Sequence, residues 1–229
     1  MNLYKELLIG AGASDWLDLL CNPARSKFSI NLLRVKLFDY VHGTNFWGEN
    51  HGRVLQNELG VSAKIANDYS ATPRTIIKVL KDYNIGPNDS IIDIGCGRGL
   101  AMYYMLKFPF HRVDGIDISD KLIASAKKNV AILINNAKVN FYEMDAGEYT
   151  RYCDYNYFYI YNSLPKKVME KFVLRVEESI KIKQRKITIF YLMPEYPEVL
   201  LNSTAFKLIS RESKNEIRNG MWVFEYIPE

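Results

Sequence analysis

The sequence has little of what marks several common classes of protein. Its three cysteines, Cys21, Cys96 and Cys153, are odd in number and widely spaced, which excludes a disulfide framework and a CxxC metal site. No apolar run approaches the roughly 18 residues that a membrane-spanning helix needs. Asp15 interrupts the apolar N-terminus too early for a secretory signal. We therefore expect a cytoplasmic protein in a reducing compartment, without a membrane span.

Histidine is equally scarce, with three residues in the chain of 229. His42, Glu49 and His51 form the one group that could supply a base or bind a metal, and their spacing matches no zinc pattern. The sequence therefore predicts no metal site. His51 remains a candidate general base for catalysis, against the alternative that it has no chemical role.

An excess of charge of either sign is also missing. The 30 basic and 26 acidic residues give a net charge of +4 and are nearly balanced along the chain. The one dense basic cluster, within residues 181–186, is interpreted as a solvated connection between a helix and a strand. No region is basic enough to provide an electrostatic footprint for nucleic acid, so no nucleic-acid partner is expected.

What the sequence does contain is the composition of a globular protein, 48% hydrophobic and 24% charged. Residues 1–70 are predicted to form an N-terminal helical extension and a lid region. Apolar residues such as Val35 and Phe38 recur at helical spacing up to residue 41, and residues 42–70 are rich in glycine and asparagine. Residues 71–229 form the predicted main domain, long enough for one full core.

Strands and helices alternate along this main domain. The predicted strands are nearly continuously apolar, which is typical of a parallel sheet covered on both faces. They span residues 90–95, 112–117, 139–144, 157–162 and 186–193, and the helices span 74–83, 98–107, 120–134 and 165–181. The last two strands, 205–211 and 221–227, are separated by too few residues for a helical crossover. They should form an antiparallel hairpin whose last strand inserts beside the fifth strand.

A glycine loop follows the first of these strands. Asp93 precedes Gly95, Gly97 and Gly99, and a helix begins directly after them. Glycines allow a sharp turn and a close approach of a ligand to the backbone. A dinucleotide site would have its third glycine at position 100, which is Leu100, and its pyrophosphate would be repelled by Asp93. The spacing therefore favours a cationic sulfonium cofactor over a nicotinamide dinucleotide, which stays the weaker alternative.

Two more acids lie at the ends of the following strands. Asp117 is placed to accept hydrogen bonds from ribose hydroxyls; its alternative role as a helix cap is equally served by Ser119 or Asp120. Asp145, next to Ala146, could accept the exocyclic amine of adenine or could cap a helix. Parallel strands end at one edge of a sheet, so these acids should meet the glycine loop there.

Together these motifs resemble the class I S-adenosylmethionine-dependent methyltransferases, from about Tyr69 to the C-terminus. The resemblance implies an α/β fold: a Rossmann-like seven-stranded sheet, parallel with a C-terminal antiparallel β-hairpin, preceded here by the N-terminal helical extension. It implies S-adenosyl-L-methionine as cofactor and a transferase activity on an acceptor. The implied cofactor-binding residues are Thr72, Asp93, Gly95, Cys96, Gly97, Gly99, Asp117, Ile118, Asp145 and Ala146.

A narrower resemblance concerns the acceptor. The segment Tyr69–Pro73 is similar to the Tyr-x-x-Thr-Pro lead-in of a group of bacterial methyltransferases of unassigned substrate. It is also similar to a segment of some seven-stranded protein-lysine methyltransferases, where it lies over the methionine end of the cofactor. The group's fourth strand ends in Asn-Pro-Phe, and here it continues as Asn162-Ser163-Leu164-Pro165. Asn162 matches, while the proline is displaced and the aromatic is missing, so an amine-methylating mechanism does not transfer directly.

The candidate catalytic residues are Asn162, His51 and Tyr69. Asn162 could accept a hydrogen bond from the acceptor, or it could cap the helix that starts at Pro165. A base is needed only where the acceptor atom is protonated at neutral pH. The even charge of residues 1–70 favours a small metabolite or a glycan intermediate. A protein lysine is the alternative acceptor, and a cofactor-binding module without independent turnover is the alternative function.

Overall fold

The computed structural model describes residues 34–47, 75–134, 138–211 and 220–228. Their strands are β1 (Ser90–Ile94), β2 (Arg112–Asp117), β3 (Phe141–Glu143), β4 (Tyr157–Tyr161), β5 (Ile187–Leu192), β6 (Lys207–Arg211) and β7 (Met221–Tyr226). The helices are α5 (Thr75–Leu80), α6 (Leu100–Met105), α7 (Asp120–Leu133), α8 (Lys166–Ile182) and α9 (Pro197–Leu201), with a 3-10 turn, η1, at Tyr152–Asp154. Residues 34–42 are also helical.

The strands form one seven-stranded sheet in the order β3-β2-β1-β4-β5-β7-β6. Strands β1 to β5 are parallel to one another, and β7 pairs antiparallel with both β5 and β6. The predicted terminal hairpin, with its last strand beside the fifth, is confirmed. Because the order reverses between β1 and β4, the chain crosses to opposite faces of the sheet on either side of this point.

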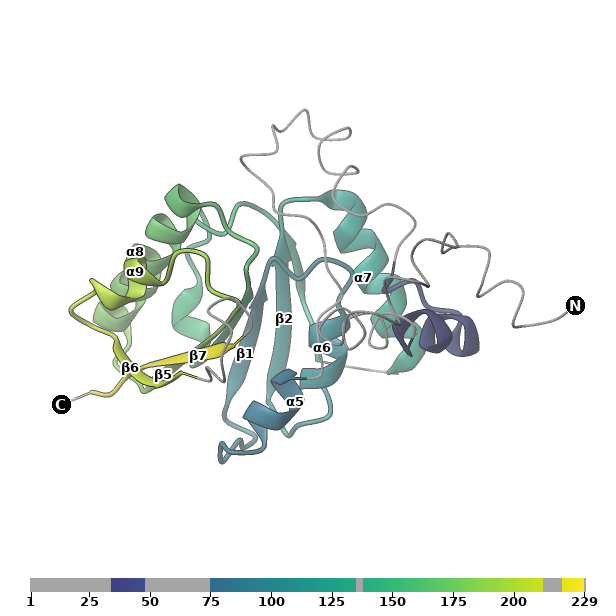
Figure 1. Cartoon of the computed structure of the whole chain (residues 1–229), viewed down its shortest axis with the longest axis horizontal. Helices are drawn as coiled ribbons and strands as arrows, with labels where there is room; N and C mark the ends of the chain where they lie inside the picture. Colours follow the sequence, from purple (N-terminus) through teal and green to yellow (C-terminus); the bar gives the residue numbers. More distant parts are fainter. Residues whose placement is uncertain (1–33, 48–74, 135–137, 212–219, 229) are drawn as a thin grey trace, which may run out of the picture.

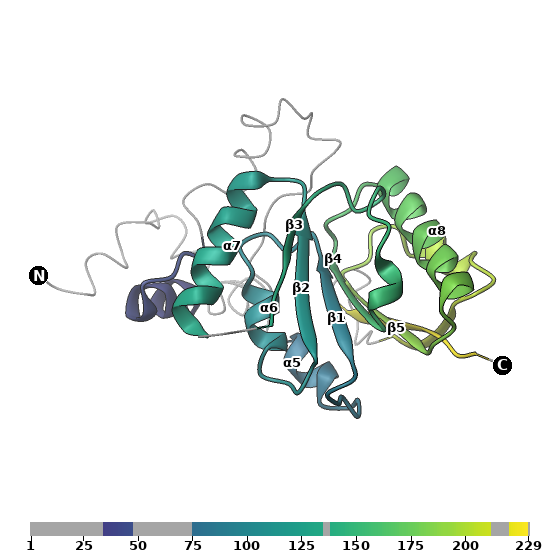
Figure 2. The same ribbon diagram turned by 180° about the vertical axis from the view of Figure 1, so that it is seen from behind.

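Helices cover both faces of the sheet (Figure 1). The helices α5, α6 and α7 lie on one face with helix 34–42, while α8 and α9 lie on the other, as the reverse view also shows (Figure 2). Alternate side chains of one strand enter different cores: Ile91 packs with the α5–α6 side, and Ile92 and Ile94 pack with the α8 side. Burial on both faces explains why these strands have no polar alternation in the sequence.

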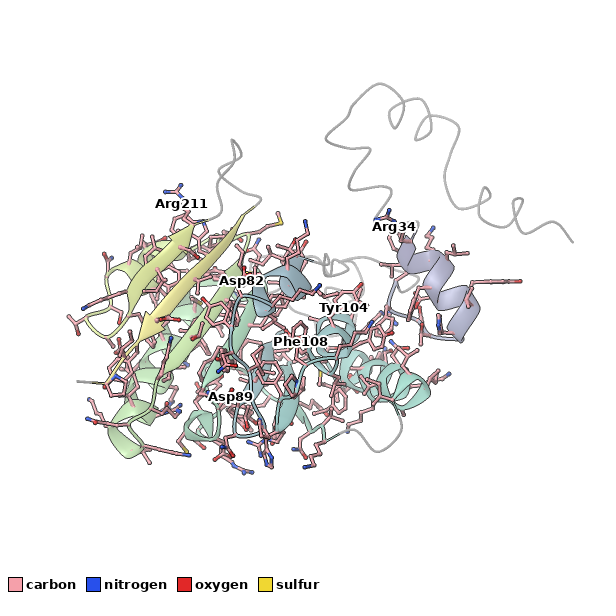
Figure 3. The ribbon with its side chains drawn as sticks, turned by 90° about the horizontal axis from the view of Figure 1, so that it is seen from below. Arg34, Asp82, Asp89, Tyr104, Phe108 and Arg211 are labelled. Atoms are coloured by element: carbon pink, nitrogen blue, oxygen red, sulfur yellow. The ribbon has the colours of Figure 1, made fainter. Side chains whose placement is uncertain are left out.

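The helix at residues 34–42 packs against α6. Val35 is buried, and Phe38 lies against the ring of Tyr103 on α6, with ring centroids 5.4 Å apart. These two positions agree with the predicted helical spacing. Figure 3 shows Arg34 on this helix at one end of the molecule and Arg211 on β6 at the other. No helix in the described ranges is long and apolar enough to cross a membrane.

The basic cluster after α8 differs in part from the prediction. Lys181 and Lys183 are exposed, as expected of a solvated connection, whereas Arg185 is half-buried. Its guanidinium donates to the carbonyls of Tyr155 at 2.6 Å and Tyr152 at 2.7 Å, and to further oxygens at the end of α8. Arg185 therefore joins the end of α8 to the η1 turn, because carbonyls at a helix end need donors from elsewhere.

Candidate functional site

The glycine loop connects β1 to α6 at the carboxyl edge of the sheet. Gly95, Gly97 and Gly99 all have positive φ, at 75°, 53° and 84°. The amides of Gly95 and Cys96 both donate to the Ile116 carbonyl, at 2.8 and 3.0 Å. Since L-residues with side chains rarely adopt this region, the three glycines are required by the turn itself.

Gly95 also lies where a second chain segment approaches closely. A Cβ atom at this position would overlap Ser163, whose Oγ would be 2.5 Å away. Ser163 follows β4, and its hydroxyl donates to the Ile94 carbonyl at 2.5 Å. The missing side chain of Gly95 thus lets the loop after β4 sit directly against the loop after β1.

Asp117 ends β2 and uses both carboxylate oxygens on backbone amides. Oδ2 accepts from Gly97 N at 2.8 Å, and Oδ1 accepts from Ser119 N at 3.0 Å. Burial raises the pKa of Asp117, while the hydrogen bonds from Ser119 and Gly97 oppose that rise. Ser119 is the N-cap of α7 and accepts from Leu122 N, so Asp117 is not needed as the cap. Each oxygen keeps lone-pair capacity for a second donor.

Asp93 lies beneath the loop, in the middle of the sheet. Its side chain is buried, and its Oδ2 has no hydrogen-bond partner among the described residues. Burial, with a further contribution from the Asp117 carboxylate, raises the pKa of Asp93 well above its usual value. An unsatisfied buried carboxyl oxygen is costly for a fold without a ligand, and a cationic or hydrogen-bond-donating group at the loop would relieve it.

An apolar surface continues from Asp117 along the sheet edge. Ile118 and Met144 follow β2 and β3 and expose 44% and 45% of their surface. The Met144 amide donates to the Asp117 carbonyl at 2.9 Å, so Met144 lies beside the end of β2. Met144 was missed in the sequence because it reads as the last residue of an apolar strand; β3 ends one residue earlier, at Glu143.

Asp145 and Ala146 lie in the turn after β3. Asp145 caps no helix: its Oδ1 accepts from Gly147 N at 2.7 Å within a turn. Ala146 is buried, and its carbonyl accepts from the Tyr152 hydroxyl. Cys96 is buried as well, and its thiol points into the core, because a Cβ built on Gly115 would lie 2.8 Å from Cys96 Sγ. Ala146 and Cys96 could therefore touch a cofactor only through their backbones.

Asn162 follows β4 and has a left-handed backbone, with φ at 41°. It does not occupy the N-cap of α8, because Pro165 does, without a side-chain cap. Met193, directly after the neighbouring strand β5, is left-handed as well, with φ at 49°. Two non-glycine residues in this region at adjacent strand ends mark a locally constrained edge, as is common at functional sites.

Several predicted site residues lie outside the described part of the chain: His51, Tyr69, Thr72, and with them Glu49 and most of the predicted lid. His42 is described, and its ring stacks on Phe38 with centroids 4.0 Å apart, while Nδ1 bonds to the Phe38 carbonyl at 2.9 Å. This is a packing role. Among the described residues no group of three His, Cys, Asp or Glu side chains could hold a metal.

The residues that the structure brings together fit S-adenosylmethionine. Asp117 offers two carboxylate oxygens where ribose hydroxyls could donate, Ile118 and Met144 offer apolar surface for a flat base, and Asp93 offers a carboxyl oxygen without a partner. The glycine loop between them leaves backbone open to close approach. The dinucleotide alternative lacks its third glycine, as the sequence already indicated.

Comparison with known proteins agrees with this geometry. The family described as methyltransferase domain matches residues 91–181. Ribosomal protein L11 methyltransferase of Thiobacillus denitrificans is 28% identical over 100 residues, which cover 42% of this chain and 33% of that protein. An O-methyltransferase of Pyrenophora dematioidea is 32% identical over 76 residues, 33% of this chain and 28% of that protein. The matched stretches thus span about a third of these relatives.

Solved structures share the fold at low identity. Ribosomal protein L11 methylase of Lactobacillus delbrueckii subsp. bulgaricus superposes with a TM-score of 0.52 at 13% identity, covering 71% of this chain and 81% of that one. Magnesium protoporphyrin IX methyltransferase of Synechocystis, solved with bound S-adenosylmethionine, gives 0.50 at 13% identity, covering 87% and 97%. Residues 91–181 therefore match the methyltransferase domain family, and the seven-stranded sheet has the fold of these solved methyltransferases.

Proposed function

We propose that this protein transfers a methyl group from S-adenosylmethionine to an acceptor bound over the carboxyl ends of β4 and β5. The observation that carries the proposal is the arrangement around the glycine loop: Asp117 held by Gly97 N, with the unsatisfied Asp93 carboxyl beside it. S-adenosylmethionine supplies an electrophilic methyl group on a sulfonium centre. The chain's own part is to bind, orient and shield the reactants.

Each residue has a separate part in this proposal. Asp117 would bind the ribose, and Ile118 with Met144 would cover the base. Asp145 Oδ1 already accepts from Gly147 N, and the other carboxylate oxygen would accept a hydrogen bond from the adenine amine. Asp93 would balance the positive charge of the cofactor through its buried carboxyl. Thr72 would contact the methionine end, as the resemblance implies.

The acceptor would lie next to Asn162. Asn162 follows β4, where the Ser163 hydroxyl donates to the Ile94 carbonyl and so holds this part of the chain beside the glycine loop. There it would accept a hydrogen bond from an acceptor hydroxyl or amine and so align it. Tyr69 and His51 are the proposed candidates for a base, should the acceptor be protonated at neutral pH.

We favour a small metabolite or a glycan intermediate as acceptor, on the balanced charge of residues 1–70. A protein acceptor is the second candidate, because two of the curated relatives are named ribosomal protein L11 methyltransferase. The family match over residues 91–181 does not distinguish them, since it ends before β5 and the hairpin. We propose that the protein acts in the cytoplasm and without a nucleic-acid partner.

Thermal unfolding with three ligands tests the cofactor. S-adenosylmethionine and S-adenosylhomocysteine at 100 times their dissociation constants should each add about 2.7 kcal/mol, which is a shift of roughly 5–11 °C for a chain of this size. NADH should give none. Asp117→Ala should lose the shift with both sulfur nucleosides. A shift with NADH alone would refute the proposal.

Methyl-labelled S-adenosylmethionine then tests the acceptor. The enzyme is incubated with a cell extract separated into small-molecule and macromolecular fractions, and Asp117→Ala is the matched control. Label in the small-molecule fraction supports the favoured acceptor, and protease-sensitive label in the other fraction supports a protein acceptor. Ligand binding without label in either would indicate a cofactor-binding module without independent turnover.

A further inference from the structure

A buried asparagine on α7 joins the glycine loop to the N-terminal extension. Asn129 is buried, with 1% of the residue exposed. Its amide nitrogen donates to the Arg98 carbonyl at 3.0 Å, and its amide oxygen accepts from Asn45 N at 2.8 Å. The two ends of the amide thus form hydrogen bonds with backbone groups that are far apart in sequence, and one of these groups lies in the glycine loop.

The contact with the loop belongs to a wider fit between α7 and the glycine turn. A Cβ on Gly99 would lie 3.2 Å from Ala126 Cβ, and Arg98 Nη1 donates to Ser125 Oγ at 3.3 Å. Ser125, Ala126 and Asn129 lie on one side of α7, because residues three and four apart share a helix face. This face of α7 therefore contacts Arg98 and Gly99 directly, and these contacts depend on the conformation of the loop.

The other end of the Asn129 amide holds a segment that is itself well organised. The Asp39 carboxylate accepts from Phe46 N at 2.9 Å and from Trp47 N at 2.8 Å, and Phe46 is fully buried. The turn after helix 34–42 is thus held by hydrogen bonds to Asp39, and it brings Asn45 N to Asn129. Figures 1 and 2 place this helix on the α6–α7 side of the sheet.

We propose that Asn129 is a positioning residue of the cofactor site and that it makes residues 34–47 part of that site. The buried amide makes both hydrogen bonds only when the glycine loop has the conformation described above and residue 45 is docked. Losing one partner leaves a buried polar atom unsatisfied, which penalises the loss of either contact. Docking of the extension and binding of the nucleoside are then linked, and the linkage is reciprocal. This inference rests on the proposed function.

The test uses S-adenosylhomocysteine and the full chain. Asn129→Ala should raise the Kd for S-adenosylhomocysteine about fivefold or more, measured by calorimetry. In the wild type, the ligand should slow hydrogen exchange at the Phe46 and Trp47 amides, which bond to Asp39 and not to Asn129. In Asn129→Ala this slowing should vanish. Lys128→Ala, an exposed neighbour on α7, is the control and should change neither result.

A second variant, Asp39→Ala, disrupts the extension without touching α7 or the loop. It should also weaken S-adenosylhomocysteine binding, and it decides the matter if Asn129→Ala does not fold. If the wild type binds S-adenosylhomocysteine and both variants bind it equally well, the linkage is refuted while the proposed function stands. If the wild type does not bind it at all, the proposed function fails first.

Discussion

Replacing Gly95 by alanine should destabilise the protein far more than its one added methyl group suggests. Its φ of 75° costs a residue with a side chain about 1–2 kcal/mol. The added Cβ would also overlap Ser163, and overpacking of this kind costs about 1–3 kcal/mol. The two together predict a loss of about 2–5 kcal/mol in the free energy of unfolding, measured by urea titration with circular dichroism.

Gly43 provides the control for the backbone contribution alone. Its φ is 68°, and nothing lies within 4 Å of a Cβ built there. Gly43→Ala should therefore cost about 1–2 kcal/mol, and the difference between the two variants measures the overlap with Ser163. Equal losses in both variants would refute the close packing of the two loops.

A double variant identifies the atom responsible. Ser163→Gly removes the overlapping side chain and with it the hydrogen bond to the Ile94 carbonyl, worth about 1 kcal/mol. In the Gly95→Ala background, Ser163→Gly should restore most of the stability that the overlap costs. The loss in the double variant should then be smaller than the sum of the two single losses by about 1–3 kcal/mol, a coupling energy typical of residues in direct contact. Additive losses would place the strain elsewhere.

Three further results are expected from the buried polar groups. Because the pKa of Asp93 is raised in the folded state, stability is lost as the pH rises from its pKa in the unfolded chain, about 3.9, through its pKa in the folded protein. Asp93→Asn should therefore raise Tm more at about pH 7 than at about pH 4. An equal change at both pH values would contradict this. Arg185→Met should cost about 2–4 kcal/mol in urea unfolding without weakening S-adenosylhomocysteine binding, while Lys183→Ala changes little. Tyr155→Phe removes the 2.6 Å hydrogen bond to buried Asp114 and should cost about 1–3 kcal/mol, and a neutral result would show that Asp114 finds another donor.

The parts of the fold that are local in sequence could be predicted. The run of Ile91, Ile92 and Ile94 followed by alternate glycines indicates a buried strand and a tight turn, and both are present. The strand at 112–117 has the predicted bounds. The short polar connection before Met221 excluded a crossover helix, which was enough to predict the antiparallel end of the sheet.

Contacts between distant segments could not be predicted in this way. Gly95 was expected to favour the turn, but its packing against Ser163 depends on how closely β1 and β4 approach. Asn129 reads as an ordinary polar position of a helix, and only the fold places it between Arg98 and Asn45. Arg185 belongs to a basic cluster that favours solvent, and the carbonyls it satisfies lie about 30 residues away or at the end of α8.

The place of β7 between β5 and β6 has a consequence for how the sheet is completed during synthesis. Among the described strands β7 is made last, yet it pairs along the whole of β5, from Ile187 to Leu192, and also holds β6. Until residues 221–226 leave the ribosome, β5 has an open edge and β6 has no neighbour. Open edges of apolar strands invite pairing with other chains. A stop at codon 221 would therefore remove two strands from the sheet instead of one.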